Sequence, residues 1–380
     1  MIVAEPLVPG IRLLINALAG TGKTTTCRSV IGKHPDKRIL YMVYNKAMQQ
    51  SAALFASETV TVCTTHALAL AYCQSLAPKA RYSAWQLPED CLELYSYWRG
   101  ECNHLDPAAA DLWDDIMDGQ LPYPTHEAYY SVFCRAPART ANWIDAAYDL
   151  VIVDEAQDTD GGLAAILDGI TVPLLLVGDV NQNLYTFRGT VNALALLDNN
   201  RAVRFNLTHS FRFGQAVADL ANRLVGTTLI GLGHTAVQRG DLAQALAQGP
   251  CTWLCRTNMR VVEQARRLTM SIHIAGTVFE QVVKLGSASA SSLARKRAVA
   301  ERIGDEQLLA CIDLVLKIPR SELDELRRRC VPATRAQCIL CTVHSAKGLE
   351  WDRVVVDAEV LRDPTLAYVA VTRAKRWLFY

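Results

Sequence analysis

An apolar run at residues 12–20, RLLINALAG, leads directly into the short segment TGKTTT, and a helix-forming pattern follows. Across the junction of these two segments, the sequence ALAGTGKT at residues 17–24 resembles the pattern G-x-x-x-x-G-K-[ST], with Ala17 at the first glycine position. A glycine-rich turn between strand and helix exposes backbone N–H groups to phosphate oxygens, while Lys23 adds a charge and Thr24 a hydroxyl for Mg²⁺. We therefore expect a nucleotide to contact Ala17, Gly20, Thr21, Gly22, Lys23, Thr24 and Thr25.

The same alternation of apolar run, polar loop and helical pattern recurs along the chain. ILYMVYNK precedes AMQQSAALF, and LVIVDEAQD precedes GLAAILDGI; later apolar runs are VPLLLVGD, WLCRTN, SIHIAG, ILCTVHS, DRVVVDAE and RWLFY. Such alternation implies parallel sheets with helices on both faces. For 380 residues, we predict an α/β fold with two stacked α/β domains.

Two segments depart from this alternation. Residues 72–142 are rich in Trp, Tyr and Pro and include the helical candidate PEDCLELYSYWRGEC, which predicts a helical insertion. Residues 284–335 combine a Ser/Ala stretch with LARKRAVAERIGDEQ and SELDELRRRC, which predicts a second, small helical insertion. Within it, SASASS at residues 287–292 is typical of a flexible joint.

Composition limits the remaining function classes. The 39 basic and 38 acidic side chains nearly cancel, so any nucleic-acid site must be local. No stretch approaches the roughly 20 apolar residues of a membrane span, and the start of the chain does not follow a signal-peptide layout. We expect a cytoplasmic protein, nucleoid-associated in a bacterium or phage, or a nuclear one in a eukaryote.

The 12 cysteines lie in apolar runs, which favours buried thiols over disulfides. The C-x-x-C spacing also permits a zinc site, but the apolar runs favour buried thiols over zinc as well.

Two further motifs end apolar runs in polar residues. In VIVDEAQD, Asp154 could hold Mg²⁺ and Glu155 could polarise an attacking water, although such carboxylates can also cap a helix. In LLLVGDVNQNLYTFRG, Gln182 could sense a γ-phosphate. Tyr185 and Phe187 follow at a spacing of two; both core packing and base stacking, worth roughly 1–3 kcal/mol per base, remain open for them.

Nine motifs in fixed order give the chain a family resemblance. AGTGKTTT, YNKAMQQSA, TTHALA, VDEAQD, VGDVNQNLYTFRG, SFRF, LCRTN, TVHSAKGLEWD and YVAVTRA resemble the UvrD/Rep-like helicases of superfamily 1. The sequences TFRGTVNAL and LTHSFRFG are especially similar to those of the F-box DNA helicase branch. The motifs run from Ala17 to Ala374, so the resemblance covers nearly the whole chain.

The resemblance implies two RecA-like P-loop NTPase domains interrupted by the two insertions. The first consists of residues 1–71 and 143–206 around the insertion 72–142; the second consists of residues 207–283 and 336–380 around the insertion 284–335, a reduced accessory subdomain.

The resemblance also implies roles for individual residues. Phe211 would stack on adenine, Glu350 would contact the ribose, and Arg212 would reach the γ-phosphate. Arg373 would act as a second arginine finger, an effect of order 10³–10⁵ in rate where it has been measured for related NTPases. The residues implied on the nucleic-acid side are Asn45, Lys46, Thr65, His66, Tyr185, Phe187, Arg188, His344 and Ser345, and each residue type also occurs on solvated loops.

The implied activity is ATP hydrolysis with Mg²⁺, coupled to 3′ to 5′ movement along single-stranded DNA in repair, recombination or replication. RNA remains open as the strand, and the alternative is an NTP-dependent switch or protein-displacing subunit with little autonomous unwinding. The second insertion has only about fifty residues, which favours weak unwinding. The family's adenine-reading Gln is absent from the sixteen residues before Ala17, so we expect weaker discrimination among nucleotides.

Overall fold

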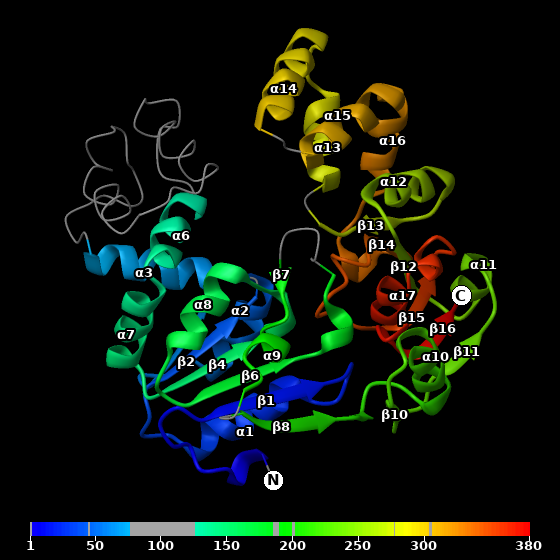
Figure 1. Cartoon of the computed structure of the whole chain (residues 1–380). Helices are drawn as coiled ribbons and strands as arrows, with labels where there is room; N and C mark the ends of the chain where they lie inside the picture. Colours follow the sequence, from blue (N-terminus) through cyan, green and yellow to red (C-terminus); the bar gives the residue numbers. More distant parts are fainter. Residues whose placement is uncertain are drawn as a thin grey trace. The chain divides into compact units, whose positions relative to one another are not determined.

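The fold is described from a computed structural model, covering residues 2–44, 46–76, 126–184, 190–199, 202–276, 278–303 and 306–380. Contacts divide the chain into two compact units: the first is Met1–Leu18 with Gly22–Leu207, and the second is Ala19–Thr21 with Thr208–Tyr380. Each unit contains a parallel six-stranded sheet flanked by helices (Figure 1). The predicted α/β class is therefore confirmed. In the described part of the chain, no helix has the length and apolar character needed to cross a membrane.

The sheet of the first unit has the strand order β3-β2-β4-β6-β1-β8, with every neighbouring pair parallel. Its strands are β1 (Arg12–Ala17), β2 (Ile39–Val43), β3 (Val60–Thr64), β4 (Leu150–Asp154), β6 (Leu174–Gly178) and β8 (Ala202–Leu207). The central strands β2, β4 and β6 are buried along their whole length, because helices cover both faces of the sheet. A short antiparallel pair joins β5 (Thr159–Asp160) to β7 (Thr190–Val191).

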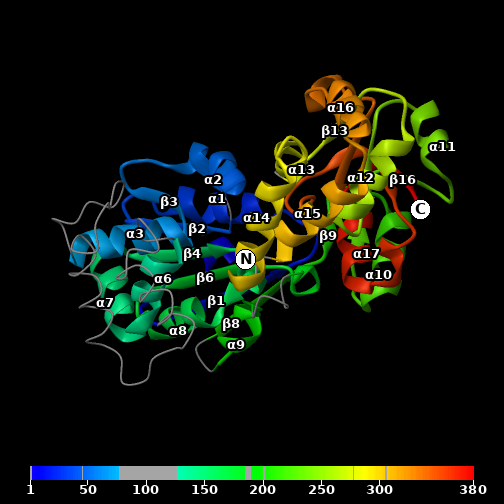
Figure 2. The ribbon, with the colours of Figure 1, turned by 90° about the horizontal axis from the view of Figure 1, so that it is seen from above.

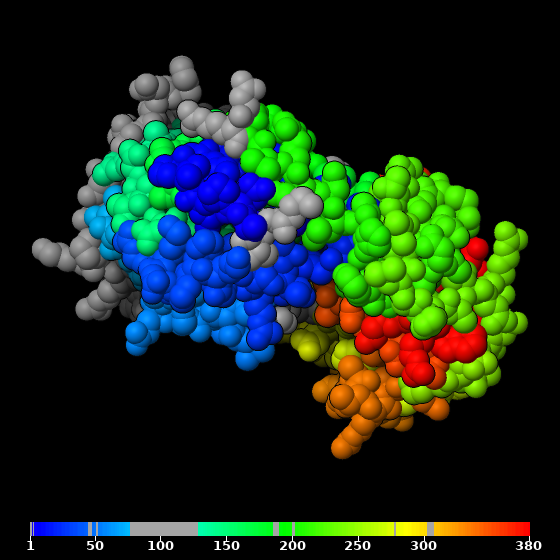
Figure 3. All heavy atoms as spheres, turned by 90° about the horizontal axis from the view of Figure 1, so that it is seen from below, coloured from blue at the N-terminus to red at the C-terminus, as the bar shows by residue number. Residues whose placement is uncertain are grey.

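Alternate residues of these strands pack into two separate cores. One face packs against α1 (Lys23–Lys33) and α2 (Lys46–Ala52). The other face packs against α3 (Thr65–Leu76), α6 (His126–Arg135), α7 (Pro137–Ala147), α8 (Gly161–Gly169) and α9 (Ala193–Leu196). Figure 2 shows these elements from above, and in the view from below the N-terminal residues, coloured blue, form much of the visible surface of this unit (Figure 3).

The sheet of the second unit has the order β11-β16-β15-β12-β14-β13, again entirely parallel. Its strands are β11 (Ala236–Gln238), β12 (Cys251–Cys255), β13 (Ile272–Ile274), β14 (Cys338–Thr342), β15 (Trp351–Val356) and β16 (Ala374–Phe379), and a separate pair joins β9 (His209–Ser210) to β10 (Ile230–Gly231). Its helices are α10 (Gln215–Val225), α11 (Leu242–Ala247), α12 (Asn258–Arg267), α13 (Val278–Gly286), α14 (Ala290–Ile303), α15 (Glu306–Lys317), α16 (Arg320–Arg329) and α17 (Pro364–Val371).

The two segments expected as insertions are helical where they are described. Residues 72–142 contribute the end of α3, all of α6 and the start of α7, and these helices join the core of the first unit. The candidate helix PEDCLELYSYWRGEC lies outside the described residues. Residues 284–335 contain α14, α15 and α16 (Figure 1). The flexible joint expected at 287–292 was wrong for residues 290–292, which form the first turn of α14 because Ser289 Oγ accepts the Ser292 N–H and caps the helix.

Candidate nucleotide and nucleic-acid site

The phosphate loop follows β1 and leads into α1, as the sequence predicts. Gly22 stands at the N-cap of α1 with φ +94°, and no side chain caps the first N–H groups of the helix. The first turn also contains no acidic residue, so it presents uncompensated donors to an anion. Ala17 is fully buried in the core, where its methyl group packs, and this explains an alanine at the position where the general pattern has glycine.

Gly20 has a close neighbour that excludes a side chain. Ala19–Thr21 group with the second unit, and within that unit Gly20 O accepts the Phe211 N–H at 2.9 Å. A Cβ on Gly20 would lie 2.5 Å from Ser210 Oγ and 2.7 Å from Arg212 Cβ, and its φ is +73°. Both the close approach and the left-handed backbone therefore require glycine here.

The side chains of the loop differ in exposure. Lys23 is half-buried, and its Nζ donates to Ala17 O at 3.2 Å, so the ammonium lies back along the loop. Thr24 and Thr25 are exposed on the first turn of α1, whereas Thr21 is buried. Lys23 and Thr24 are thus placed on the segment that presents the uncapped N–H groups.

Asp154 and Glu155 stand at the carboxyl end of β4, where both side chains are buried. Asp154 Oδ2 accepts the Tyr41 hydroxyl at 2.9 Å, and its Oδ1 accepts the Glu155 N–H at 2.9 Å. Burial, followed by the neighbouring Glu155 charge, raises the pKa of Asp154 to about 6, while Lys23 and Tyr41 act in the opposite direction. A cation beside Asp154 would offset this cost of burying a carboxylate.

Glu155 adopts a left-handed backbone with φ 54°, the sole positive φ of a non-glycine residue within the described ranges. Such a conformation costs of order 1–3 kcal/mol and is found most often at functional sites. Its carboxylate Oε2 accepts Gln157 Nε2 at 2.5 Å. This hydrogen bond holds the Glu155 carboxylate against the Gln157 amide.

A chain of hydrogen bonds connects Glu155 with Gln182. The other end of the Gln157 amide, Oε1, accepts the Asp179 N–H at 3.1 Å, and Asp179 Oδ2 accepts Gln182 Nε2 at 2.7 Å. Gln157, Asp179 and Gln182 are all buried. Two predicted residues from separate motifs are thus joined through Gln157 and Asp179, neither of which we singled out from the sequence.

The oxygen ligands of the first unit suit Mg²⁺. Mg²⁺ is usually held by one or two carboxylates, the remaining positions being filled by water and substrate phosphate. Asp154 and Thr24 provide a carboxylate and a hydroxyl, which are oxygen ligands of this kind. Across the described ranges, no cluster of three or more His, Cys, Asp or Glu side chains could hold a metal by itself. The cysteine pairs expected to be buried lie on β12 and β14 as free thiols.

Only some of the residues that were predicted to contact nucleic acid in the first unit lie within the described ranges. Asn45, Tyr185, Phe187 and Arg188 lie outside the described residues. Lys46 begins α2, and Thr65 and His66 begin α3, at the ends of β2 and β3. Thr65 is half-buried, and His66 is exposed with its ring centroid 5.1 Å from that of Tyr130.

In the second unit, Phe211 is 71% exposed, which is unusual for a phenylalanine in a folded unit and suits a stacking surface. The adjacent Arg212 donates from Nε to Glu350 Oε2 at 2.7 Å and from Nη1 to Thr372 O at 3.1 Å. The two residues expected to contact phosphate and ribose therefore pair with each other. Lys375 Nζ lies 3.6 Å from the same Glu350 carboxylate.

Arg373 is only 2% exposed, and its guanidinium binds acceptors of its own unit. It donates to Val369 O at 2.9 Å, Leu349 O at 3.3 Å and Thr372 Oγ1 at 3.2 Å. An arginine finger in this conformation would have to exchange some of these acceptors for phosphate oxygens.

His344 and Ser345 lie in the turn that follows β14. Ser345 is exposed, its N–H donates to Thr342 Oγ1 at 3.2 Å, and its Oγ accepts from the same hydroxyl at 3.0 Å. His344 is half-buried. The paired bonds to Thr342 hold the turn directly against the end of the strand.

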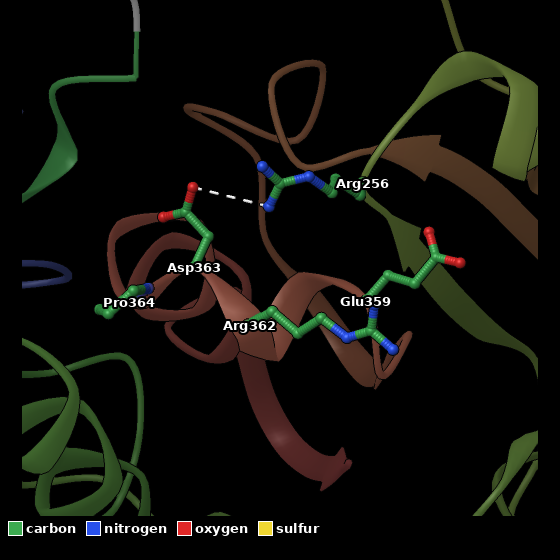
Figure 4. Close-up of a pocket in the computed structure, with 5 residues that line it drawn as sticks. All are labelled: Arg256, Glu359, Arg362, Asp363 and Pro364. Atoms are coloured by element: carbon green, nitrogen blue, oxygen red, sulfur yellow. Dashed lines mark ion pairs between the residues drawn. The ribbon is translucent and has the colours of Figure 1, made fainter.

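A pocket of about 550 Å³ opens at the carboxyl ends of β12 and β15, and it is lined by Arg256, Glu359, Arg362, Asp363 and Pro364 (Figure 4). Arg256 belongs to the LCRTN motif, and its Nη1 lies 3.6 Å from Asp363 Oδ2. Carboxyl ends of parallel strands are the usual ligand edge of such sheets. Two arginines and two carboxylates balance here, however, so the lining has no net preference for an anion.

Family models match both ends of the chain. A model described as an AAA domain matches residues 3–188, and a model of the UvrD-like helicase C-terminal domain matches residues 338–379. The first contains the phosphate loop, Asp154, Glu155 and Gln182. The second contains His344, Glu350 and Arg373.

Relatives with helicase names align over most of the chain. F-box DNA helicase 1 of Gallus gallus is 26% identical over 96% of this chain and 46% of its own length. F-box DNA helicase protein 1 of Schizosaccharomyces pombe is 25% identical over 100% of this chain and 56% of its own length. A probable DNA helicase of Mycoplasma pneumoniae is 27% identical over 60% of this chain. The chain spans about half the length of the two F-box helicases. Both family matches and these relatives support a UvrD-like helicase of superfamily 1.

Proposed function

We propose that this chain hydrolyses ATP to move along single-stranded DNA as a translocase and helicase. The observation that carries the proposal is the hydrogen-bonded chain from Glu155 through Gln157 and Asp179 to Gln182. It connects the carboxylate suited to activate water with the amide suited to sense the γ-phosphate. A structural acidic cap would not require such a buried connection.

In this proposal, the first unit binds the phosphates and activates water. The N–H groups of the first turn of α1 and the Lys23 ammonium bind phosphate oxygens, and Asp154 and Thr24 hold Mg²⁺, which neutralises developing charge when bound. Glu155 accepts a proton from the attacking water while Gln157 holds its carboxylate in place. Gln182 responds to loss of the γ-phosphate and passes the change to Asp179.

The second unit would contribute stacking and charge. Phe211 offers an exposed ring for adenine, and Arg212 exchanges its Glu350 partner for phosphate while Glu350 turns to the ribose. Arg373 supplies the second positive charge after releasing its carbonyl acceptors. We propose that ATP draws these arginines to its phosphates and that hydrolysis releases them. This cycle would alternately strengthen and weaken the binding of the strand.

The strand would be held by residues of both units, through phosphate and sugar more than base edges. The proposed contacts are Asn45, Lys46, Thr65, His66, Tyr185, Phe187, Arg188, His344 and Ser345. We propose 3′ to 5′ movement and a role in repair, recombination or replication, in a nucleoid or nucleus. The three relatives reported above carry the names of DNA helicases, one of them as a probable DNA helicase, which supports DNA over RNA.

The proposed movement can be tested on single strands carrying a streptavidin block at one end. We expect ATP-dependent displacement of streptavidin from the 5′ end and little from the 3′ end, with Lys23→Ala as the inactive control. Displacement only from the 3′ end would refute the proposed direction, and displacement from neither end would refute translocation.

The second candidate is an NTP-dependent switch or protein-displacing subunit. The small size of the second insertion, which contains α14, α15 and α16, favours it over autonomous unwinding. Strand displacement from 3′-tailed duplexes separates the two functions. Streptavidin displacement without duplex opening favours the protein-displacing function, and opening of the 3′-tailed duplex favours the helicase.

A further inference from the structure

The ring of Tyr130 supports the exposed side chain of His66. His66 lies in the first turn of α3 and Tyr130 on α6, and these two helices pack side by side in the first unit (Figures 1 and 2). The two ring centroids are 5.1 Å apart with an interplanar angle of 39°. The Tyr130 ring also stacks on Phe133, with the ring centroids 6.1 Å apart. A group that displaces the His66 ring would therefore press directly on Tyr130.

The hydroxyl of Tyr130 binds Asp160 on a different element. It donates to Asp160 Oδ2 at 2.5 Å, while Asp160 Oδ1 accepts the Leu163 N–H at 2.9 Å and caps α8. A hydrogen bond from a hydroxyl to a carboxylate is shorter and stronger than one between neutral groups. Both oxygens of Asp160 thus have defined partners, and Tyr130 holds the carboxylate against α6.

Asp160 ends the same short segment that begins with Asp154 and Glu155. Between them, Thr159 Oγ1 donates to Ala156 O at 2.9 Å, which keeps the segment compact. Asp160 also lies in β5, whose antiparallel partner β7 pairs Asp160 with Thr190. Thr190 Oγ1 in turn donates to Asn183 Oδ1 at 3.2 Å, one residue after Gln182. The Tyr130 hydroxyl is therefore hydrogen-bonded to Asp160, the residue at which the segment that follows Glu155 pairs with the segment that follows Gln182.

We infer that Tyr130 is a positioning residue that couples strand contact at His66 to the segments carrying Glu155 and Gln182. The inference rests on the proposed function and adds a specific path to it. A base or phosphate that binds at His66 shifts the Tyr130 ring, and the hydroxyl carries that shift to Asp160 and so to β5 and β7. Tyr130 is not one of the residues proposed to contact the nucleotide phosphates or the attacking water.

The test compares Tyr130→Phe with the matched Tyr148→Phe, which also removes one hydroxyl from a partly buried tyrosine of the same core. Steady-state ATP hydrolysis is measured as a function of single-stranded DNA and of ATP. In Tyr130→Phe we expect DNA-stimulated turnover to fall about tenfold more than turnover without DNA, with the KM for ATP and the half-saturating DNA concentration within about twofold of the parent. Tyr148→Phe should retain the parental stimulation.

A third variant distinguishes coupling from general packing. Asp160→Asn keeps the oxygen that caps α8 and an amide that can donate to the Tyr130 hydroxyl, so most of the stimulation should remain. Equal stimulation of Tyr130→Phe and the parent would overturn the inference and leave the proposed function standing. An equal loss with and without DNA, or failure of Tyr130→Phe to fold, would overturn it by showing a structural role. Absence of DNA stimulation in the parent would overturn both the inference and the proposed function.

Discussion

Replacement of Gln157 by leucine should lower both the stability of the first unit and the rate of ATP hydrolysis by the protein. Gln157 is fully buried, and leucine has a similar size, so the change opens little cavity. It removes the bond to the Glu155 carboxylate, worth roughly 1.5–3 kcal/mol, and leaves the Asp179 N–H without its side-chain acceptor, at roughly 1–3 kcal/mol. We expect Gln157→Leu to lower the free energy of unfolding by about 3–5 kcal/mol.

The same variant should slow hydrolysis, because the Glu155 carboxylate loses the donor that fixes its direction. A positioned general base contributes on the order of 10²–10⁴-fold, so we expect kcat to fall at least about tenfold. Urea unfolding followed by fluorescence and steady-state ATPase assays measure the two effects.

Gln264→Leu is the matched control for both measurements. Gln264 is also buried and donates to a carboxylate, Asp357 Oδ2, at 3.3 Å, but it lies in the second unit. Asp357 keeps its bond from Arg260 Nε at 3.0 Å, so the cost should be about 1 kcal/mol. Its turnover should stay within about twofold of the parent. A Gln157→Leu protein with parental kcat would refute the role given to this amide.

Three further predictions concern single residues. Lys23→Ala should abolish turnover while thermal unfolding stays close to the parent, and measurable kcat would contradict the phosphate role. Phe211→Ala should raise the KM for ATP without lowering the thermal midpoint, because the ring is 71% exposed; an unchanged KM would count against stacking. Arg38 lowers the pKa of Asp149 to about 2, so the pair stabilises the fold above the ordinary carboxyl range near pH 4, and the gain is lost as pH falls toward 2. Since both groups are well exposed, Asp149→Asn should cost under about 1 kcal/mol at pH 7 and progressively less as pH falls through 2, by urea unfolding.

Strands that are buried on both faces could be predicted from the sequence, because they are continuous apolar runs. β2, β4 and β6 are of this kind, and all three were predicted. The edge strands β3 and β8 were missed. Their side chains are only partly buried, as in the sequence AVRFNL of β8, so they lack the apolar signal.

The capping serine of α14 shows a different limit of sequence interpretation. A run of Ser and Ala fits a linker as well as a helix start, and only the neighbouring helices of the second unit decide between them. Ser289 caps α14 through the Ser292 N–H, and Leu293 is buried in the core of that unit. Local composition alone could not provide this information.

The candidate site was predicted residue by residue, but its connections were not. Motif order indicated Glu155 and Gln182, whereas the bonds through Gln157 and Asp179 depend on the neighbouring strands β4 and β6. The bond from Tyr41 to Asp154 likewise depends on the pairing of β2 with β4. Side-chain orientation across a sheet follows from register, which one sequence does not reveal.

ATP hydrolysis measured with and without single-stranded DNA, in the parent and in Glu155→Gln, decides whether this chain couples ATP turnover to a DNA strand. We predict that single-stranded DNA raises turnover of the parent, whereas Glu155→Gln still binds nucleotide and hydrolyses none. A parent whose turnover is the same with and without every single strand would contradict the proposed function. So would a Glu155→Gln protein that retains the parental rate.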